Sequence, residues 1–471
     1  MKKTKIICSI GPASQSVEVM SKMVMNGMNV ARVNFSHGDY NEYLDILNVV
    51  KATRINTRRN IAVLYDTKGP DFRCGEIVEE GINLVKDGIV RIIKNQIVGA
   101  NNYFSVNHPE VIDKINVGNT VLLEDALMRL EVVSKEEDGV TCVVKDGGIL
   151  KSKKGIAVPG VKLDIPFMSE QDRKDIEFAC KNEGDFIALS FVESRENILE
   201  VKELLRQFNR EDMKIISKVE SQTGVDNLSE IIDESDGIMV ARGDLGVEVA
   251  LEKLPIIQKD MIRRCREHEK FVIVATEMLA SMYEASRPTR AEVTDISNAV
   301  LDGADAVMLS GESTVGKHPV EAVKYMAKIC EEAEKNNIYA TWFNHSMNND
   351  ITEAIAKSVI DSADNLKVKA IVVPTTGGHS AIVISNLRPK SVILALCPNE
   401  AIARKLLLNY GIYPIVTEMV KDDDMDFTVQ NARDKAVEYL GLNEKDTIII
   451  TGGIHHSKAI KQTNFMKIEE I

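Results

Sequence analysis

Residues 214–249 read KIISKVESQTGVDNLSEIIDESDGIMVARGDLGVEV, in which two short apolar runs each end in charged residues and a helical segment separates them. Side chains two positions apart in a strand share a face, so Lys218 and Glu220 are expected to point the same way. If the two strands are parallel neighbours, Asp244 joins them from the end of the second. These groups, with the free amides of Gly243 and Asp244, predict a site for a divalent metal and a phosphate. Taken alone, the stretch also fits a surface ion-pair cluster at strand ends.

Length and composition restrict the class of protein. The chain has 471 residues, enough for two to four domains. Its net charge of −13 argues against a general nucleic-acid or anionic-membrane surface. The seven cysteines are widely spaced without a Cys-x-x-Cys pair, so neither a disulfide framework nor a zinc ribbon is expected. The first apolar run is broken by Gly11 and Pro12 and is too short for a signal peptide or a membrane span. We therefore expect a soluble cytoplasmic protein that binds no nucleic acid and no membrane.

One pattern recurs along the chain: a short β-branched run that ends in polar residues and is followed by an amphipathic helical segment. Eight strands are predicted, at residues 4–9, 29–34, 61–66, 186–190, 214–220, 237–242, 271–276 and 306–310. Strands that alternate with helices indicate a parallel sheet, and eight of them predict a closed (β/α)8 TIM barrel.

The third and fourth predicted strands are separated by far more chain than one βα unit needs. This insert is rich in short β runs and turn glycines, which predicts a small β-barrel or sandwich able to act as a lid. After a polar and aromatic linker at 337–349, the βα pattern restarts as an open-sheet α/β domain. The predicted domains are the barrel at 1–70 and 166–345, the insert at 71–165, and the C-terminal domain at 351–471. Strands of the C-terminal domain are predicted at 370–373, 392–395, 414–416 and 447–450.

Chemistry in such barrels lies at the C-terminal ends of the strands. Arg32 and Arg73 carry guanidinium groups suited to phosphate oxygens, although each alone also fits an ordinary surface arginine. Thr276 supplies a hydroxyl, or simply caps a helix. The remaining strand ends offer oxygen donors with a single carboxylate among them, which suits a monovalent cation. These donors are Asn34, Ser36, Asp66 and the carbonyl of Thr67.

Several motifs together resemble the pyruvate kinase family. They are ARVNFSHG at 31–38, DTKGP at 66–70, KIISKVES at 214–221, SDGIMVARGDLGVE at 235–248, ATEML at 275–279, RPTRAEVTDISNAVLDGADAVMLSGES at 287–313, and a late GG…TN pattern at 452–464. The resemblance spans the whole chain and implies a central barrel, an inserted lid, a C-terminal regulatory domain and a homotetramer. It implies phosphoryl transfer from phosphoenolpyruvate to ADP, giving pyruvate and ATP in glycolysis.

The resemblance also implies roles for the matching residues. Arg32 would hold the substrate phosphate, and Lys218 would stabilise charge on the phosphoryl group and the developing enolate. Thr276 would position the substrate and the water chain that protonates the enolate. The amides of Gly243 and Asp244 would orient the substrate carboxylate.

Cations and nucleotide are implied as well. Glu220 and Asp244 would ligate Mg²⁺ or Mn²⁺, while Arg73 and Asn34 would meet the nucleotide. The resemblance assigns K⁺ to Asn34, Ser36, Asp66 and Thr67. Asp71 keeps a carboxylate where potassium-dependent members have glutamate, so K⁺ is expected to be retained. A phosphorylated effector is a further expectation, at the loop 375–380.

Five positions depart from the family's usual pattern. Gln171 and Glu193 stand where lysine and arginine are usual, Ser221 and Glu277 replace asparagine and glutamine, and Ala126 replaces glycine. The added negative charge is expected to weaken binding of nucleotide phosphates, and Gln171→Lys is expected to lower the KM for ADP. Two alternatives stay open: a catalytically weak regulatory paralogue, and a nucleotide-independent barrel lyase acting on phosphoenolpyruvate or oxaloacetate.

Overall fold

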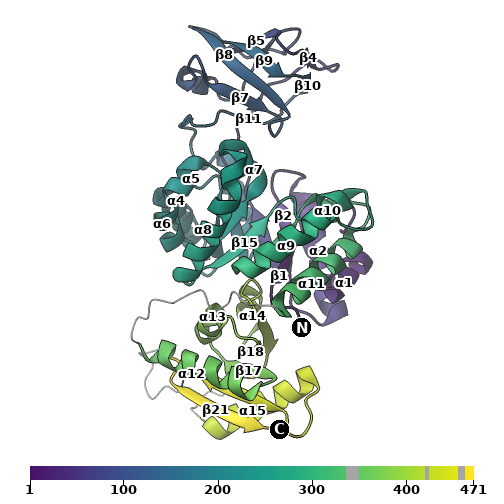
Figure 1. The fold of residues 1–471 in the computed structure, drawn as a ribbon, viewed down its shortest axis with the longest axis vertical. Helices are drawn as coiled ribbons and strands as arrows, with labels where there is room; N and C mark the ends of the chain where they lie inside the picture. Colours follow the sequence, from purple (N-terminus) through teal and green to yellow (C-terminus); the bar gives the residue numbers. More distant parts are fainter. Residues whose placement is uncertain (336–349, 419–423, 454–461) are drawn as a thin grey trace.

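The computed structural model describes residues 1–335, 350–418, 424–453 and 462–471, and its centre is a closed barrel of eight parallel strands (Figure 1). The strands are β1 (Lys5–Ser9), β2 (Val30–Asn34), β3 (Ala62–Asp66), β12 (Phe186–Leu189), β13 (Lys214–Val219), β14 (Gly237–Ala241), β15 (Phe271–Ala275) and β16 (Ala306–Leu309). Each strand falls within its predicted range, so the TIM barrel is confirmed. β13 and β14 are parallel neighbours, with Lys218 opposite Met239.

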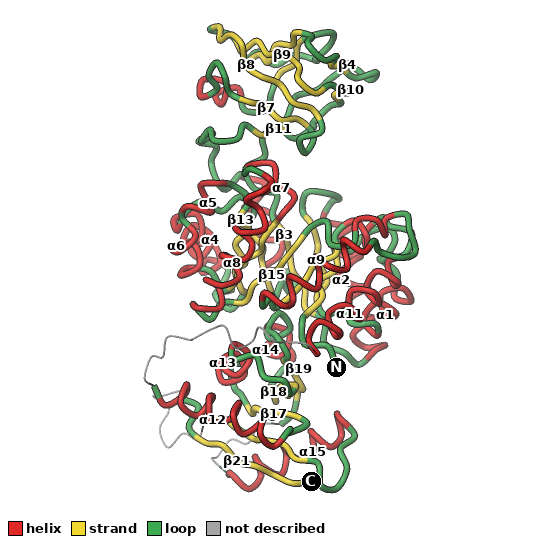
Figure 2. The backbone as a smooth tube through the Cα atoms, viewed as in Figure 1, coloured by secondary structure: helices red, strands yellow, loops and turns green. Residues whose placement is uncertain are grey.

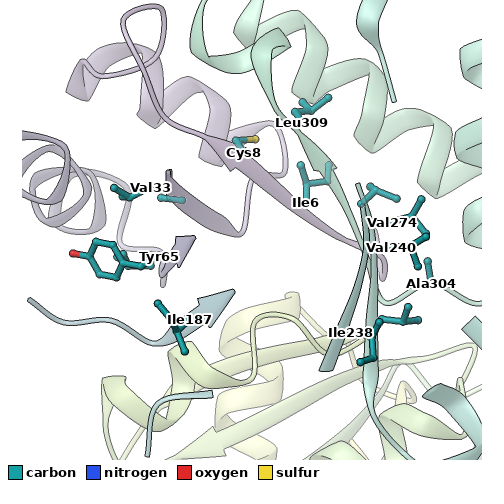
Figure 3. Close-up of a cluster of buried hydrophobic side chains, with 14 of the residues drawn as sticks. Ile6, Cys8, Val33, Tyr65, Ile187, Ile238, Val240, Val274, Ala304 and Leu309 are labelled. Carbon is teal, nitrogen blue, oxygen red and sulfur yellow. The ribbon is translucent and has the colours of Figure 1, made fainter. Parts of the chain in front are cut away.

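Helices cover the outside of the barrel (Figure 1). They are α1 (Val17–Met25), α2 (Tyr40–Thr57), α3 (Glu170–Lys181), α4 (Arg195–Gln207), α5 (Gln222–Asp226), α6 (Leu228–Glu234), α7 (Arg242–Glu248), α8 (Leu254–Glu267), α9 (Arg290–Asp302), α10 (Gly311–Thr314) and α11 (Pro319–Lys335), with 3-10 turns η2 (Leu251–Lys253) and η3 (Ala280–Tyr283). Alternate strand residues such as Ile6, Val240 and Val274 belong to the core that these helices cover (Figure 3). The other alternate residues, among them Ile7 and Ile216, belong to a separate inner cluster.

The insert after β3 is a separate β domain with its own apolar core. It contains β4 (Ile82–Leu84), β5 (Ile89–Ile93), β6 (Tyr103–Ser105), η1 (Pro109–Lys114), β7 (Thr120–Leu123), β8 (Met128–Glu136), β9 (Gly139–Asp146), β10 (Gly148–Leu150) and β11 (Ile156–Ala157). Six strands form one sheet in the order β11-β7-β8-β9-β5-β6, and β10 pairs with β4. Figure 1 shows the insert and the C-terminal domain at opposite ends of the barrel.

The C-terminal domain is an open α/β sheet with helices packed on it (Figure 2). It contains α12 (Ile351–Leu366), β17 (Ala370–Pro374), α13 (His379–Asn386), β18 (Val392–Cys397), α14 (Glu400–Lys405), β19 (Ile412–Val416), α15 (Met425–Leu440), β20 (Thr447–Gly452) and β21 (Phe465–Glu470). The four predicted strands are present, whereas the antiparallel edge strand β21 was not predicted. The predicted boundary at 345 and the linker at 337–349 lie outside the described residues, and the other domain boundaries stay predictions.

The C-terminal domain closes the barrel end at which the strands begin. Leu407 and Leu408 join the inner cluster of the barrel. Arg388 Nη1 contacts Asp305 Oδ1 at 2.7 Å, just before β16, and Arg404 Nε contacts Asp185 Oδ1 at 2.9 Å, just before β12. Both aspartates are buried and also accept a backbone N–H from a neighbouring strand, so the arginines brace the barrel rim.

The turn between β7 and β8 gives a stability prediction. Glu124, Asp125 and Ala126 all have left-handed φ, of 50°, 52° and 65°, a region that costs a residue with a Cβ about 1 kcal/mol. Ala126 is exposed, so Ala126→Gly removes this cost without opening a cavity. We expect a gain of about 0.5–1 kcal/mol in the free energy of unfolding, measured by urea denaturation. Ala157→Gly, in β11, is the control and is expected to destabilise; a loss of stability in both variants would contradict the prediction.

Candidate active site

A cavity of about 640 Å³ lies at the C-terminal ends of the barrel strands, where the insert meets the barrel. Its barrel side includes Arg32, Asn34, Ser36, Lys218, Glu220 and Asp244, and its insert side includes Leu122, Asp125, Ala126 and Ile156. The cavity therefore has the position expected of an active site in this fold, with the insert as its roof.

Lys218 occupies the centre of a buried group of charges. Its Nζ lies 3.0 Å from Asp66 Oδ1 and 3.2 Å from Glu220 Oε1. The other oxygen of Asp66 accepts a hydrogen bond of 2.6 Å from Arg32 Nε, and Arg32 Nη1 donates to Ser9 Oγ at 2.7 Å. Asp66 is fully buried and Glu220 is 1% exposed, so the ion-pair cluster is not on the surface.

The pKa shifts follow from burial and from these pairs. Burial disfavours the ammonium of Lys218, but the carboxylates of Asp66 and Glu220 outweigh it and raise the Lys218 pKa. Burial likewise opposes ionisation of Asp66, whose pKa is nevertheless lowered by Arg32 and Lys218. For Glu220 burial wins over Lys218, and its pKa rises to about 7. Lys218 is thus a fixed cation, whereas ionisation of Glu220 costs free energy even with Lys218 beside it, and a second cation would lower that cost.

Two carboxylates face the cavity where a divalent ion was predicted. Glu220 Oε2 accepts the Phe191 amide at 2.7 Å, which fixes its orientation, and Asp244 stands exposed to the cavity. Withdrawal from bulk solvent raises the pKa of Asp244 despite the nearby Lys218. In the described part of the chain, no group of three or more His, Cys, Asp or Glu side chains could hold a metal. Two carboxylates fit Mg²⁺ or Mn²⁺ only if substrate oxygens and water complete the coordination.

Thr276 and Gly243 contact each other beside Asp244, are half-exposed, and are not among the residues that line the cavity. The Gly243 amide donates to Thr276 Oγ1 at 2.8 Å, and Thr276 Oγ1 donates to Ala275 O at 2.6 Å. The Gly243 amide is therefore engaged here and must change partner to meet a substrate carboxylate.

The predicted potassium ligands gather at the ends of β2 and β3. Asn34 and Ser36 line the cavity, and Asn34 Oδ1 accepts the Ser36 amide at 3.1 Å. Asp66 and Thr67 lie buried behind them, and the Thr67 carbonyl accepts Ser190 Oγ at 2.6 Å. The donor set, all oxygen with one carboxylate, fits a monovalent cation. Arg73 lines the cavity and pairs with Asp71, which Lys68 also contacts at 3.1 Å.

The departures from the family pattern occupy different places. Glu193, Ser221 and Ala126 line the cavity, whereas Gln171 and Glu277 do not. Gln171 instead donates to Asp175 Oδ1 at 2.8 Å and to Tyr40 at 3.0 Å. Glu193 Oε1 accepts Ser221 Oγ at 2.7 Å, so two of the departures contact each other. Of the two changes that replace a usual cation, only Glu193 places its charge at the cavity.

Two residues of the site were missed in the sequence. Glu248 lines the cavity, and burial, together with Glu193 and Asp244, raises its pKa to about 7. Arg242 binds the backbone at the end of β15. Both residues belong to the stretch 214–249. The glutamate that ends the motif GDLGVE could have indicated Glu248 as a further carboxylate of the site. The direction of the Arg242 side chain, in contrast, could not be predicted from the sequence.

Fold and site together define a (β/α)8-barrel enzyme with a roofed, charged cavity at the C-terminal ends of its strands. The family model for the pyruvate kinase barrel domain matches residues 1–323, and that for the pyruvate kinase alpha/beta domain matches residues 353–469.

Individual proteins similar to this chain are also pyruvate kinases. The chain is 41% identical over 473 residues to a pyruvate kinase of Bacillus licheniformis, covering 99% of this chain and 80% of that protein. It is 42% identical over 476 residues to one of Geobacillus stearothermophilus, covering 100% and 80%. The crystal structure of a pyruvate kinase from Cryptosporidium parvum superposes with a TM-score of 0.92 at 35% identity, covering 100% of this chain and 96% of that one. The chain belongs to the pyruvate kinase family and is a phosphotransferase.

The raised pKa of Glu248 predicts a pH-dependent stability. The folded protein holds this proton more tightly than the unfolded chain, whose ordinary value is 4.5, so stability falls as pH rises from about 4.5 to about 7 and stays lowered above it. Glu248→Gln should therefore be more stable than the parent at pH 8, by on the order of 1 kcal/mol after allowance for cavity water, and should lose this advantage near pH 4.5. Melting temperatures across this range provide the check. Glu80→Gln, at an exposed position of the insert, should show no such trend.

Proposed function

We propose that this chain transfers the phosphoryl group of phosphoenolpyruvate to ADP and releases pyruvate and ATP, as a step of glycolysis. The observation that carries the proposal is the fixed ammonium of Lys218, buried between Asp66 and Glu220 at a roofed cavity. Phosphoryl transfer needs neutralised and aligned anions more than it needs a nucleophile. Conversion of the enolate to the ketone drives the transfer. The reaction requires no covalent intermediate with the protein.

The positively charged residues have separate tasks in this proposal. Arg32 presents its guanidinium to the cavity beside Lys218 and holds the phosphate of phosphoenolpyruvate. Lys218 stabilises charge on the transferring phosphoryl group and on the enolate oxygen, and its raised pKa keeps it charged at neutral pH.

The two proposed metal sites have oxygen donors that suit their ions. Glu220 and Asp244 would hold Mg²⁺ or Mn²⁺, and Asn34, Ser36, Asp66 and Thr67 would hold K⁺. When bound, these ions neutralise the phosphoryl oxygens. Glu220 would then share a second cation besides Lys218, which would lower the cost of burying its negative charge.

The carboxylate of the substrate is met by the amides of Gly243 and Asp244. For this the Gly243 amide leaves Thr276 Oγ1, which frees the hydroxyl to position the substrate and the water that protonates the enolate. Arg73 and Asn34 meet the nucleotide under the insert, whose position over the cavity excludes water.

Further parts of the proposal concern assembly, regulation and location. The family resemblance supports a homotetramer and a phosphorylated effector at the loop 375–380. In that region Thr375 Oγ1 accepts the Gly378 amide at 2.9 Å, and Ser380 Oγ accepts Thr463 Oγ1 at 2.7 Å. The seven cysteines are free and buried, as expected of a cytoplasmic protein. No helix in the described part of the chain combines the length and apolar character that a membrane span requires.

A coupled assay for pyruvate with phosphoenolpyruvate, ADP, Mg²⁺ and K⁺ tests the proposed reaction. Lys218→Met removes the fixed cation and is expected to lower kcat at least about 100-fold. No pyruvate above the Lys218→Met level from the parent protein would support the weak regulatory paralogue. Turnover of phosphoenolpyruvate or oxaloacetate without nucleotide would support the lyase.

Glu193 gives a prediction on the nucleotide side. Its carboxylate faces the cavity, so Glu193→Gln should lower the KM for ADP about 3–10-fold by removing a negative charge near the phosphates, with kcat little changed. Gln171→Lys is the comparison, because Gln171 lies outside the cavity lining, and its effect should stay within about twofold. Steady-state kinetics with ADP varied decide between them. A larger effect at Gln171 would show that the charge at Glu193 does not face the nucleotide.

A further inference from the structure

The loop after β15 holds an unfavourable backbone conformation. Thr276 and Glu277 both have left-handed φ, of 66° and 54°. For a β-branched residue such as Thr276 this conformation is rare and costs on the order of 1–3 kcal/mol. Conformations of this kind persist only where neighbouring groups hold them, and such groups are present here.

The guanidinium of Arg242 holds this loop. Ala241 and Ala275 are register partners, so Arg242 and Thr276 leave β14 and β15 at the same level. Arg242 Nε donates to Ala275 O at 3.2 Å, Nη2 donates to Thr276 O at 2.6 Å, and Nη1 binds Asp295 Oδ2 on α9 at 2.6 Å. Each of the three guanidinium nitrogens has a partner: one is on the strained residue Thr276 and one is on Ala275, immediately before it.

The same residue fixes the neighbouring loop. Arg242 is joined directly to Gly243, whose amide donates to Thr276 Oγ1. The segment that carries Asp244 and the segment that carries Thr276 are therefore tied together twice, through the Arg242 side chain and through the Gly243 amide. Arg242 itself does not line the cavity, so it can influence the reaction only through these residues.

We propose that Arg242, anchored by Asp295, is a positioning residue of the phosphoryl-transfer site, which sets the places of Thr276 and Asp244. This inference rests on the proposed function. Lysine cannot replace Arg242, because an ammonium is a single point of donation, whereas the planar guanidinium reaches two carbonyls and a carboxylate at fixed angles. Misplacement of a positioned group by about 1 Å is enough to cost about 100-fold in rate.

The kinetic test uses Arg242→Lys and Asp295→Asn. Both are expected to lower kcat for pyruvate formation at least about 10-fold while the KM for ADP stays within about twofold, because the nucleotide side of the cavity is untouched. Arg404→Lys is the matched control: its side chain is 11% exposed, as is that of Arg242, and it pairs with Asp185 at the opposite end of the barrel. Its kcat should stay within twofold of the parent at a similar loss of melting temperature.

A second readout does not depend on activity. Hydrogen exchange measured by mass spectrometry without substrate should be faster in peptides covering 242–246 and 275–279 of Arg242→Lys and Asp295→Asn, and unchanged there in Arg404→Lys. Unchanged exchange in both site variants, or an equal kcat loss in Arg404→Lys, overturns the inference. A parent protein without pyruvate kinase activity but with the expected exchange pattern overturns the proposed function and leaves the positioning role standing. If Arg242→Lys does not fold, Asp295→Asn carries both measurements.

Discussion

The carboxylate of Asp66 organises the mouth of the barrel. It is fully buried, with Arg32 on one oxygen and Lys218 on the other, and Lys218 in turn contacts Glu220. A buried charge is tolerated only when it is paired, so each member of this chain requires the next. Removal of Asp66 would leave two cations without their shared partner in a low-dielectric interior, where the free-energy penalty is several kcal/mol. The positions of the cationic groups at the cavity therefore follow from one carboxylate at the end of β3.

At the opposite end of the barrel, buried carboxylates are also paired with arginines, and there the pairs join two domains. Asp185 and Asp305 precede β12 and β16, and each is paired with an arginine of the C-terminal domain. Leu407 and Leu408 fill the inner core beneath the strands. The C-terminal domain thus contributes side chains to the apolar interior of the barrel. These contacts lie at the barrel end opposite the cavity.

The alternation of eight β-branched runs with helical segments was enough to predict the barrel. Side-chain alternation within a strand is a local property, and it placed Lys218 and Glu220 on one face. Strand β21 escaped prediction because it pairs antiparallel at an edge and its sequence alternates weakly. The sequence could not show that Gln171 donates a hydrogen bond to Asp175, or that Arg242 donates to the backbone of the loop after β15. The direction of a long side chain depends on the partners that the folded structure places around it. The left-handed backbone of Thr276 is likewise imposed by tertiary contacts that no local pattern records.

Two of the residues that depart from the family pattern, Ser221 and Glu193, stabilise each other on the cavity wall. Ser221 Oγ accepts the Gly224 amide at 3.2 Å, which caps α5, and donates to Glu193 at 2.7 Å. A hydroxyl can do both at one atom, so serine at 221 satisfies the helix end and one oxygen of the carboxylate together. The pKa of Glu248 is raised first by burial and then by the negative charge of Glu193. Neither Glu193 nor Glu248 forms an ion pair with Lys218, whose partners are Asp66 and Glu220. The wall can therefore change its charge while Lys218, Asp66 and Glu220 keep their own compensated set. In the proposed reaction this would separate variation in nucleotide binding from phosphoryl transfer.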